Sequence, residues 1–315
     1  MFGRRKDGKL VKNVDPILRV TSAIMPKRYD AMVNYLLEVR NENSVKYIQE
    51  QSEKGNSISY FHILIAAIVR MYAERPELNR FVMNTRVYQR NDIQVSFAVK
   101  RSLRDGAEET TIKLTFDGTE NLFQIKEKID QAVKENKGAN NTKSNSTDKF
   151  AKFLIAMPPF ILKMAMGLLR FMDRHGMIPK KLLDLSPFHA SCFVSSMKSI
   201  STEYVYHHIY DFGTVGMFAA IGKEITRPEY DEKGKLEPAQ ITQIGVVIDE
   251  RICDGFYYAK SIRLIKKYLL QPWLLEQNYV YPEKELTEKE KKALNKKNKK
   301  LMKKQYKMAM KSMKK

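Results

Sequence analysis

Apolar residues recur at every second position in several stretches of this chain, which is the pattern of a half-buried β-strand. Residues 93–99 and 112–116 both alternate in this way. Because Arg104-Asp105-Gly106 between them is typical of a turn, we expect the two stretches to pair as a hairpin. Three more strands are predicted, at 191–197, 214–222 and 241–248.

Elsewhere the apolar residues are spaced three or four apart, which predicts amphipathic helices. We expect the first helix to begin at Pro26, since proline is favoured at the first helical position, and to reach Val39. The second begins at Ser57 or Ser59, either of which can cap it, and stops before Pro76. Two further helices are predicted, at 122–133 and 256–270.

Composition divides the chain into a lead-in, a folded domain and a tail. We expect residues 1–25 to be a basic, irregular lead-in and residues 26–282 to form the folded domain. Within that domain, residues 135–149 are polar and predict a mobile insert, whereas residues 151–175 predict an apolar helical insert. Residues 283–315 are a lysine-rich tail.

Half of the net charge of +20 belongs to the tail, where 14 lysines stand against four glutamates in residues 283–315. The charge therefore does not indicate a nucleic-acid-binding domain, and the tail lacks the interleaved aromatic residues that stack on bases. One interpretation of the tail is a solvated extension. The other is an electrostatic contact with an anionic partner, for which an anionic membrane surface is favoured over RNA or an acidic protein.

The longest apolar stretch, residues 153–169, is interrupted by Pro158, Pro159 and Lys163, so we expect no transmembrane helix. No apolar stretch follows the first charged residues, and we therefore expect no secretory leader. The two cysteines suggest neither a disulfide framework nor a metal site. These features favour a cytoplasmic protein, with peripheral contact to a membrane as an open alternative.

The segment Asp249-Glu250-Arg251-Ile252-Cys253-Asp254-Gly255 joins the last predicted strand to the last predicted helix. It resembles the His-x-x-x-Asp-Gly motif of chloramphenicol acetyltransferase and of the dihydrolipoamide acyltransferase subunit of 2-oxoacid dehydrogenase complexes, with Glu250 in the place of the histidine. Four other segments resemble these families in the same order, at 75–79, 193–195, 213–222 and 269–275.

The resemblance covers roughly residues 20–280. It implies an α/β fold, a two-layer sandwich with a mixed β-sheet like that of the coenzyme-A-dependent acyltransferases. It also implies a homotrimer whose substrate channels run between subunits. We expect neither the lipoyl domain nor the subunit-binding domain that accompanies such cores, and therefore no covalent lipoyl group on this chain.

In the family, the motif histidine is the general base. Glu250 occupies that position, and a free carboxyl, with a pKa of about 4.3, is a weaker base unless burial raises that pKa. The histidines do not match the base position, and His189 or His208 is the first choice if one is recruited. Cys253 is expected to be a buried structural thiol rather than a nucleophile.

The resemblance also implies two supporting roles. Asp254 would pair with an arginine and brace the loop that carries the base, and Arg28 is the expected partner, with Arg19 as the alternative. Ser195 would donate a hydrogen bond to the oxyanion. Because neighbouring strand residues face opposite ways, only one of Ser195 and Ser196 can do so.

These roles predict an acyltransferase of the 2-oxoacid dehydrogenase acyltransferase-subunit type. It would transfer an acyl group to or from coenzyme A or a similar thiol, with a small-molecule donor and acceptor and without a metal. The alternative is a catalytically inactive relative that acts as a trimeric binding or scaffold protein, at a membrane surface or elsewhere.

Overall fold

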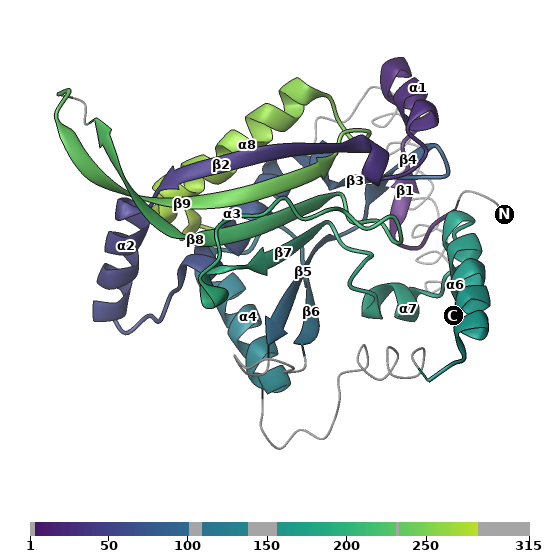
Figure 1. Ribbon diagram of the computed structural model, residues 1–315, viewed down its shortest axis with the longest axis horizontal. Helices are drawn as coiled ribbons and strands as arrows, with labels where there is room; N and C mark the ends of the chain where they lie inside the picture. The colour runs from purple at the N-terminus through teal and green to yellow at the C-terminus, as the bar shows by residue number, and fades with distance from the viewer. Residues whose placement is uncertain (1–3, 101–108, 138–155, 231–232, 283–315) are drawn as a thin grey trace, which may run out of the picture. The chain divides into compact units, whose positions relative to one another are not determined.

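A six-stranded mixed β-sheet forms the centre of the fold (Figure 1). The computed structural model describes residues 4–100, 109–137, 156–230 and 233–282. The strand order is β2-β9-β8-β7-β5-β6, in which β7 runs parallel to β8 and β5 and the other neighbours are antiparallel. The strands are β2 (Met32–Arg40), β5 (Ile93–Lys100), β6 (Glu109–Phe116), β7 (Cys192–Ser196), β8 (Met217–Tyr230) and β9 (Leu236–Asp249).

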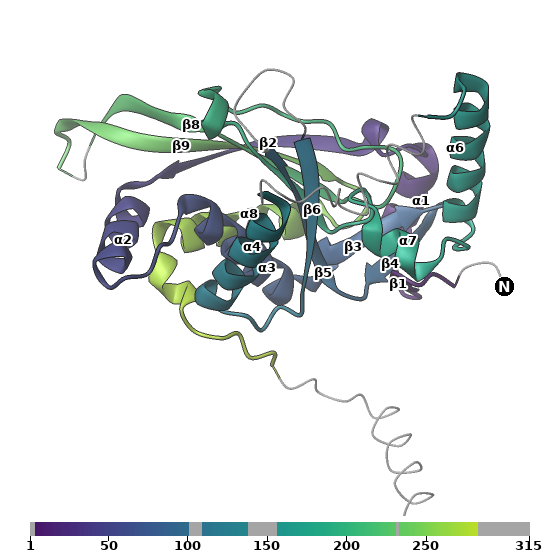
Figure 2. The same ribbon diagram turned by 90° about the horizontal axis from the view of Figure 1, so that it is seen from below.

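Four helices cover one face of this sheet, as Figure 2 shows from below. They are α2 (Glu42–Glu53), α3 (Tyr60–Glu74), α4 (Leu122–Lys137) and α8 (Gly255–Leu270). Helix α3 is the centre of the layer, because 13 of its 15 residues are buried. The main core lies between these helices and the sheet, so the fold is the two-layer sandwich with a mixed sheet that the sequence predicted.

A second, three-stranded sheet and three helices complete the described elements. They are β1 (Gly8–Leu10), β3 (Arg80–Met83), β4 (Arg86–Arg90), α1 (Pro16–Ile24), α6 (Pro159–Arg174) and α7 (Lys180–Leu185). Short 3-10 turns occur at Tyr29–Ala31, Pro76–Asn79, Lys198–Ile200 and Pro272–Leu275. The described helices and strands all belong to residues 1–279, and the chain's other unit is residues 280–315. Among the described helices, none combines the length and the apolar content needed to cross a bilayer.

Several predicted elements are confirmed. Strands β5 and β6 pair as the expected antiparallel hairpin, although the predicted turn between them lies outside the described residues. Ser59 is the cap of α3: its hydroxyl accepts a hydrogen bond from the backbone of His62, whose ring accepts one from the backbone of Ser59 in return. Most of the polar insert and the lysine-rich tail also lie outside the described residues.

Two predictions near the N-terminus were wrong. The expected helix from Pro26 to Val39 is a strand, since Met32–Arg40 pairs with β9 along its whole length. Short apolar stretches fit either period, and here pairing with a buried strand decides. The supposedly irregular lead-in contains β1 and α1, and α1 begins at Pro16 with the Asp15 side chain as its cap.

The sheet face opposite the helices is crossed by residues 202–210, a strap without regular secondary structure. The strap lies directly on two glycines of the sheet. A Cβ atom at Gly245 would stand 2.2 Å from the carbonyl oxygen of Val205, and one at Gly222 would stand 2.5 Å from the backbone nitrogen of Tyr204. Glycine is therefore required at both positions for the strap to reach the sheet.

We expect Gly245→Ala to destabilise the fold by about 1–3 kcal/mol, because the new methyl group overlaps the strap backbone, which must move. The matched control is Gly167→Ala in α6, where a Cβ atom meets nothing within 4 Å. This substitution should leave the stability unchanged or raise it slightly, because alanine is the better helix former. Urea unfolding at a constant m-value measures both changes. Equal midpoints for the two variants would contradict the close approach of the strap.

Candidate functional site

The candidate site is the turn between β9 and α8, where the family-like motif lies. Strand β9 ends at Asp249, and the backbone N–H of Glu250 donates to the carbonyl oxygen of Ala31 at 2.9 Å. Helix α8 begins at Gly255, and the Asp254 carboxylate caps it by accepting a hydrogen bond from the backbone N–H of Tyr257 at 2.8 Å. The turn therefore places the exposed Glu250 side chain between two anchored ends.

A buried cluster of two arginines and one carboxylate supports this turn. Arg251 donates to both carboxylate oxygens of Asp249, from Nε and from the terminal guanidinium nitrogen Nη2, each at 2.7 Å. The Nε atom of Arg28 lies 3.5 Å from the same carboxylate. All three residues are almost completely buried. Arg251 also donates to the carbonyl oxygen of Met25, so the cluster ties the turn to the segment before β2.

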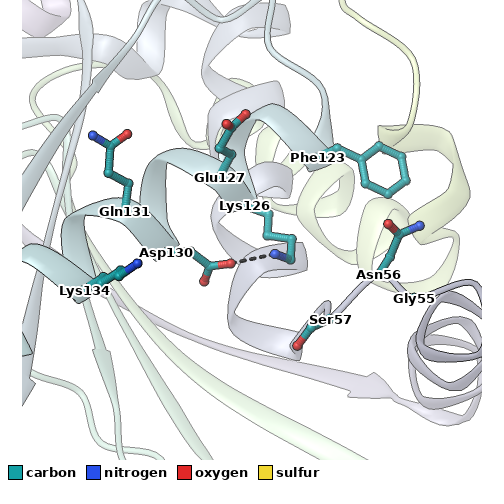
Figure 3. Close-up of a pocket in the computed structure, with 9 residues that line it drawn as sticks. All are labelled: Gly55, Asn56, Ser57, Phe123, Lys126, Glu127, Asp130, Gln131 and Lys134. Carbon is teal, nitrogen blue, oxygen red and sulfur yellow. Dashed lines mark hydrogen bonds and ion pairs between the residues drawn. The ribbon is translucent and has the colours of Figure 1, made fainter.

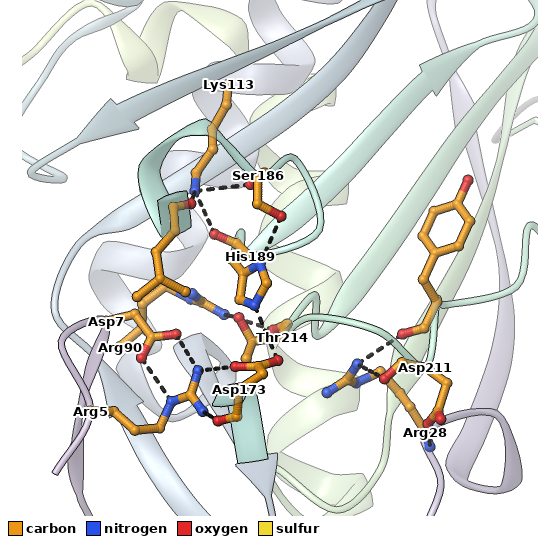
Figure 4. Close-up of polar contacts among 12 residues, drawn as sticks. Arg5, Asp7, Arg28, Arg90, Lys113, Asp173, Ser186, His189, Asp211 and Thr214 are labelled. Atoms are coloured by element: carbon orange, nitrogen blue, oxygen red, sulfur yellow. Dashed lines mark hydrogen bonds and ion pairs between the residues drawn. The ribbon is translucent and has the colours of Figure 1, made fainter. Parts of the chain in front are cut away.

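The expected pairing of Arg28 with Asp254 is corrected by this geometry. The Arg28 guanidinium faces Asp249 and donates to the carbonyl oxygen of Tyr210. The backbone N–H of Arg28 donates to Asp211, which lies beside it in Figure 4. Asp254 is exposed and serves as a helix cap. Because Asp254 is the N-cap of α8, its carboxylate meets backbone N–H groups of that helix. Asp249 is still part of β9, and its carboxylate meets the buried arginines. The alternative partner, Arg19, is an exposed residue of α1.

A pocket of about 440 Å³ lies beside the turn, between α1 and α8. Its polar members are Glu250, Asp254 and Thr21, and apolar side chains form most of the remaining wall. Cys253 also lines it, but burial raises the pKa of this thiol to about 12, and the side chain is almost inaccessible. Cys253 therefore fits the predicted role of a structural thiol. The apolar wall consists of Ile17, Leu18, Ile24, Met25, Val33, Ile248 and Tyr258.

Ser195 does not meet Glu250 within one chain. Ser195 pairs with Ala220 on β8, which pairs with Gly245 on β9, five residues before Glu250. That offset alone corresponds to about 16 Å along the strand. Ala220 belongs to the small core on the face away from the helices, so Ser195 faces that side, whereas Ser196 is paired with Ile221 of the main core.

Among the residues that line the Glu250 pocket there is no histidine. His208 is an exposed residue of the strap, and His62 helps to cap α3. His189 is buried: its Nδ1 atom lies 2.7 Å from the Ser186 hydroxyl and its Nε2 atom lies 3.1 Å from Asp173 (Figure 4). Burial lowers the pKa of His189, although the hydrogen bond to Asp173 opposes this effect.

The contacts of His189 belong to a larger polar network that sequence reasoning missed (Figure 4). Asp173 bridges His189 and Arg5, and Arg5 also binds Asp7 through both carboxylate oxygens. Burial by itself would raise the pKa of Asp173, but the hydrogen bond from His189 and the nearby Arg5 lower it to about 2. The partners lie up to 168 residues apart, so no local pattern could reveal them.

Lys113 on β6 is held against the loop that carries His189. Its ammonium donates to the carbonyl oxygens of Leu183 at 2.8 Å and His189 at 2.7 Å (Figure 4). Burial lowers the pKa of Lys113 to about 7. Lys113 therefore joins the edge strand β6 to the segment before β7. Its contacts and those of Asp173 stabilise this part of the protein through buried polar groups.

A second hollow, of about 530 Å³, lies between α4 and the connection from α2 to α3 (Figure 3). It is polar: Lys126 donates to Asp130 at 2.6 Å, and Phe123 lies at one end. Asp130 also lies 3.2 Å from the Nε2 atom of His62. The residues that the sequence predicted for catalysis are not part of this hollow.

The sequence matches no known protein family and no curated protein. Solved structures do show the fold, each with a TM-score of 0.51. A probable dihydrolipoamide acetyltransferase from Listeria monocytogenes 4b F2365 is 16% identical over 87% of this chain and 99% of that one. Azotobacter vinelandii dihydrolipoamide acetyltransferase is 12% identical, and the match covers 84% of this chain and 93% of that one. The cubic core of the pyruvate dehydrogenase multienzyme complex is also 12% identical, and the match covers 85% of this chain and 94% of that one. The suspected resemblance to acyltransferase cores is thus confirmed at the level of the fold.

Two aspartates of the turn provide a matched test of which carboxylate supports it. Asp249→Asn leaves two buried arginines without their counter-charge, and we expect a loss of about 3–5 kcal/mol in the free energy of unfolding. Asp254→Asn keeps a residue that caps helices well and should cost less than about 0.5 kcal/mol. Chemical denaturation measures the free energy of unfolding of both variants. A larger loss for Asp254→Asn than for Asp249→Asn would show that Asp254, as the sequence predicted, is the carboxylate that supports the turn.

Proposed function

We propose that this protein is an acyltransferase that moves an acyl group between coenzyme A, or a similar thiol, and a small-molecule partner. The observation that carries the proposal is the position of Glu250. It lies at the strand-to-helix turn, on a pocket, in a fold shared with dihydrolipoamide acetyltransferases. The pocket's apolar wall suits an acyl chain, and its polar rim suits the reacting groups.

Spacing in one structural neighbour supports the proposal. For the Azotobacter vinelandii enzyme, the catalytic mechanism has been investigated through a serine, a histidine and an asparagine, and the last two are four residues apart. Glu250 and Asp254 have the same spacing, and Ser195 precedes them on β7. The replacement of histidine by glutamate keeps a proton acceptor at the first of these positions.

In the proposed reaction, the Glu250 carboxylate accepts the proton of the thiol as its sulfur attacks the acyl carbonyl carbon. The carbonyl oxygen becomes an oxyanion, to which the Ser195 hydroxyl donates a hydrogen bond. The intermediate collapses when the bond to the leaving group breaks, and protonated Glu250 returns its proton to that group. The new thioester and the deacylated donor, which carries the returned proton, then leave the pocket.

The proposed enzyme is a homotrimer with each site between two subunits. Two observations support this arrangement. Ser195 and Glu250 of one chain are well separated, so a site that contains both draws them from different chains. Helix α1, which borders the Glu250 pocket, also presents unpartnered apolar side chains, with Ile17 74% and Ile24 72% exposed. A neighbouring subunit would cover this face and bury Glu250.

A second candidate function is a trimeric binding or scaffold protein without activity. The observation in its favour is the absence of histidine from the residues that line the Glu250 pocket. Such a protein would keep the fold and the subunit contacts of an acyltransferase, and its pocket would bind a ligand without transferring an acyl group. Contact with an anionic membrane through residues 283–315, which lie outside the described residues, is compatible with either function.

Thiol release from a panel of acyl-coenzyme A esters tests the catalytic proposal. We expect Glu250→Gln to lower kcat by about 10²- to 10⁴-fold through loss of the base, and Glu250→His to retain turnover. Ser195→Ala should lower it by about 10²- to 10³-fold, whereas its matched control, Ser196→Ala on the opposite sheet face, should change little. A wild-type protein that binds the esters but turns none over would favour the scaffold.

Mixing two inactive variants tests the shared site. Glu250→Gln and Ser195→Ala chains, co-expressed with different tags and purified as mixed trimers, place an intact Glu250 opposite an intact Ser195 in some interfaces. Each mixed trimer has one such interface among its three, so the purified trimers should show about a third of the wild-type activity, as expected for a heterologous interface between chains. Mixed trimers with no activity, formed from two variants that are each correctly folded, would show that the site lies within one chain.

A further inference from the structure

Helix α6 turns its apolar side chains outward. Of its sixteen residues, Asp173 is the one that is buried. Four large apolar side chains are more than half exposed: Phe160 by 72%, Met164 by 69%, Leu168 by 60% and Phe171 by 52%. An amphipathic helix that only packed on its own domain would bury such residues. These four residues, called here the α6 stripe, therefore form an exposed apolar patch of the kind that contacts another molecule or a membrane.

The direction of the stripe follows from helix geometry. Met164 precedes Asp173 by nine residues, which at about 3.6 residues per turn is two and a half turns, so the two lie on opposite faces. Asp173 is held against the body of the protein by Arg5 at 2.7 Å and His189 at 3.1 Å. Anchoring through Asp173 thus points Met164 and the rest of the stripe away from the protein. Figures 1 and 2 show α6 at one end of the fold, beside rather than beneath the sheet.

The charges of α6 indicate what the stripe contacts. Lys163, Arg170 and Arg174 are exposed, and they lie along one border of the stripe because they are spaced seven and four residues apart, as on one face of a helix. The helix's one acidic residue, Asp173, is buried and paired, so all of its exposed charges are positive. The chain as a whole carries +20. A second copy would bring like charges to this border, whereas an anionic surface would complement it.

We propose that α6 docks on an anionic lipid surface and lies in the plane of the interface. The α6 stripe would enter the boundary between headgroups and acyl chains, which is where phenylalanine, leucine and methionine side chains of interfacial helices lie. Lys163, Arg170 and Arg174 would extend to the lipid phosphates along the border. The network around Asp173 would hold the helix rigidly in this orientation. This inference is independent of the proposed acyl transfer.

Co-sedimentation of the full-length protein with vesicles tests the proposal. We expect binding to vesicles of phosphatidylcholine with phosphatidylglycerol, weakening as salt is added, and little binding to phosphatidylcholine alone. The charge variant Lys163→Gln/Arg170→Gln/Arg174→Gln should bind about 10- to 100-fold more weakly at low salt. Its matched control, Lys12→Gln/Lys54→Gln/Lys266→Gln, removes three exposed charges elsewhere and should keep most of the affinity.

The apolar half of the contact is tested by Phe160→Ser/Leu168→Ser, which should abolish binding that survives in high salt. The control Tyr230→Ser/Leu236→Ser removes two exposed apolar side chains, 73% and 57% exposed, from the β8–β9 hairpin and should bind as the wild type does. Far-ultraviolet circular dichroism establishes that each variant is folded.

Three outcomes would overturn the proposal. Binding that disappears when residues 283–315 are removed but is unchanged in both α6 variants would assign lipid contact to the tail. A smaller assembly for Phe160→Ser/Leu168→Ser in light scattering, with vesicle binding unchanged, would assign the α6 stripe to a subunit contact. If the charge variant bound the vesicles as tightly as the wild type does, the basic border would not be what recognises the lipid.

Discussion

The buried cluster of Asp249, Arg251 and Arg28 is the interaction on which the geometry of the candidate site depends. Removing three charged groups from water costs several kcal/mol for each ion, and their mutual contacts offset that cost only while all three stay in place. The cluster joins the end of strand β9 to the segment that leads from α1 into β2. Both walls of the Glu250 pocket are thereby positioned by one set of ion pairs.

The two faces of the sheet have different roles. Helices cover one face and form the main core with it, and the other face carries a small core and a strap that rests on glycine backbone. Ser195 lies on this second face, in the same row as Ala220 and Gly245, close to where the strap crosses. The row thus places a hydroxyl on a face that is only partly covered within one chain. The polar network at Asp173 attaches α6 to the body of the protein through the one buried residue of that helix.

Much of the fold could be predicted from short-range patterns. The period-two alternation of residues 93–99 and the Ser59 cap are local features, and each has the predicted structural consequence. Where a local pattern was ambiguous, the prediction was wrong. The segment from Met32 to Val39 fits both a helix and a strand, and nine pairs with β9 decide for the strand. In the candidate site, the motif positions of Glu250 and Asp254 could be identified, but their partners could not.

The sequence by itself determined the order of most elements and the segment that forms the candidate site, because each depends on residues close together in the chain. Its resemblance to acyltransferase cores implied the two-layer fold. The tertiary structure alone decided that Arg28 faces Asp249 rather than Asp254, that Asp173 meets Arg5 and His189, and that the α6 stripe points outward. These contacts join residues distant in sequence. Their energies come from burial and from charge pairing in three dimensions, and one-dimensional spacing carries no information about either.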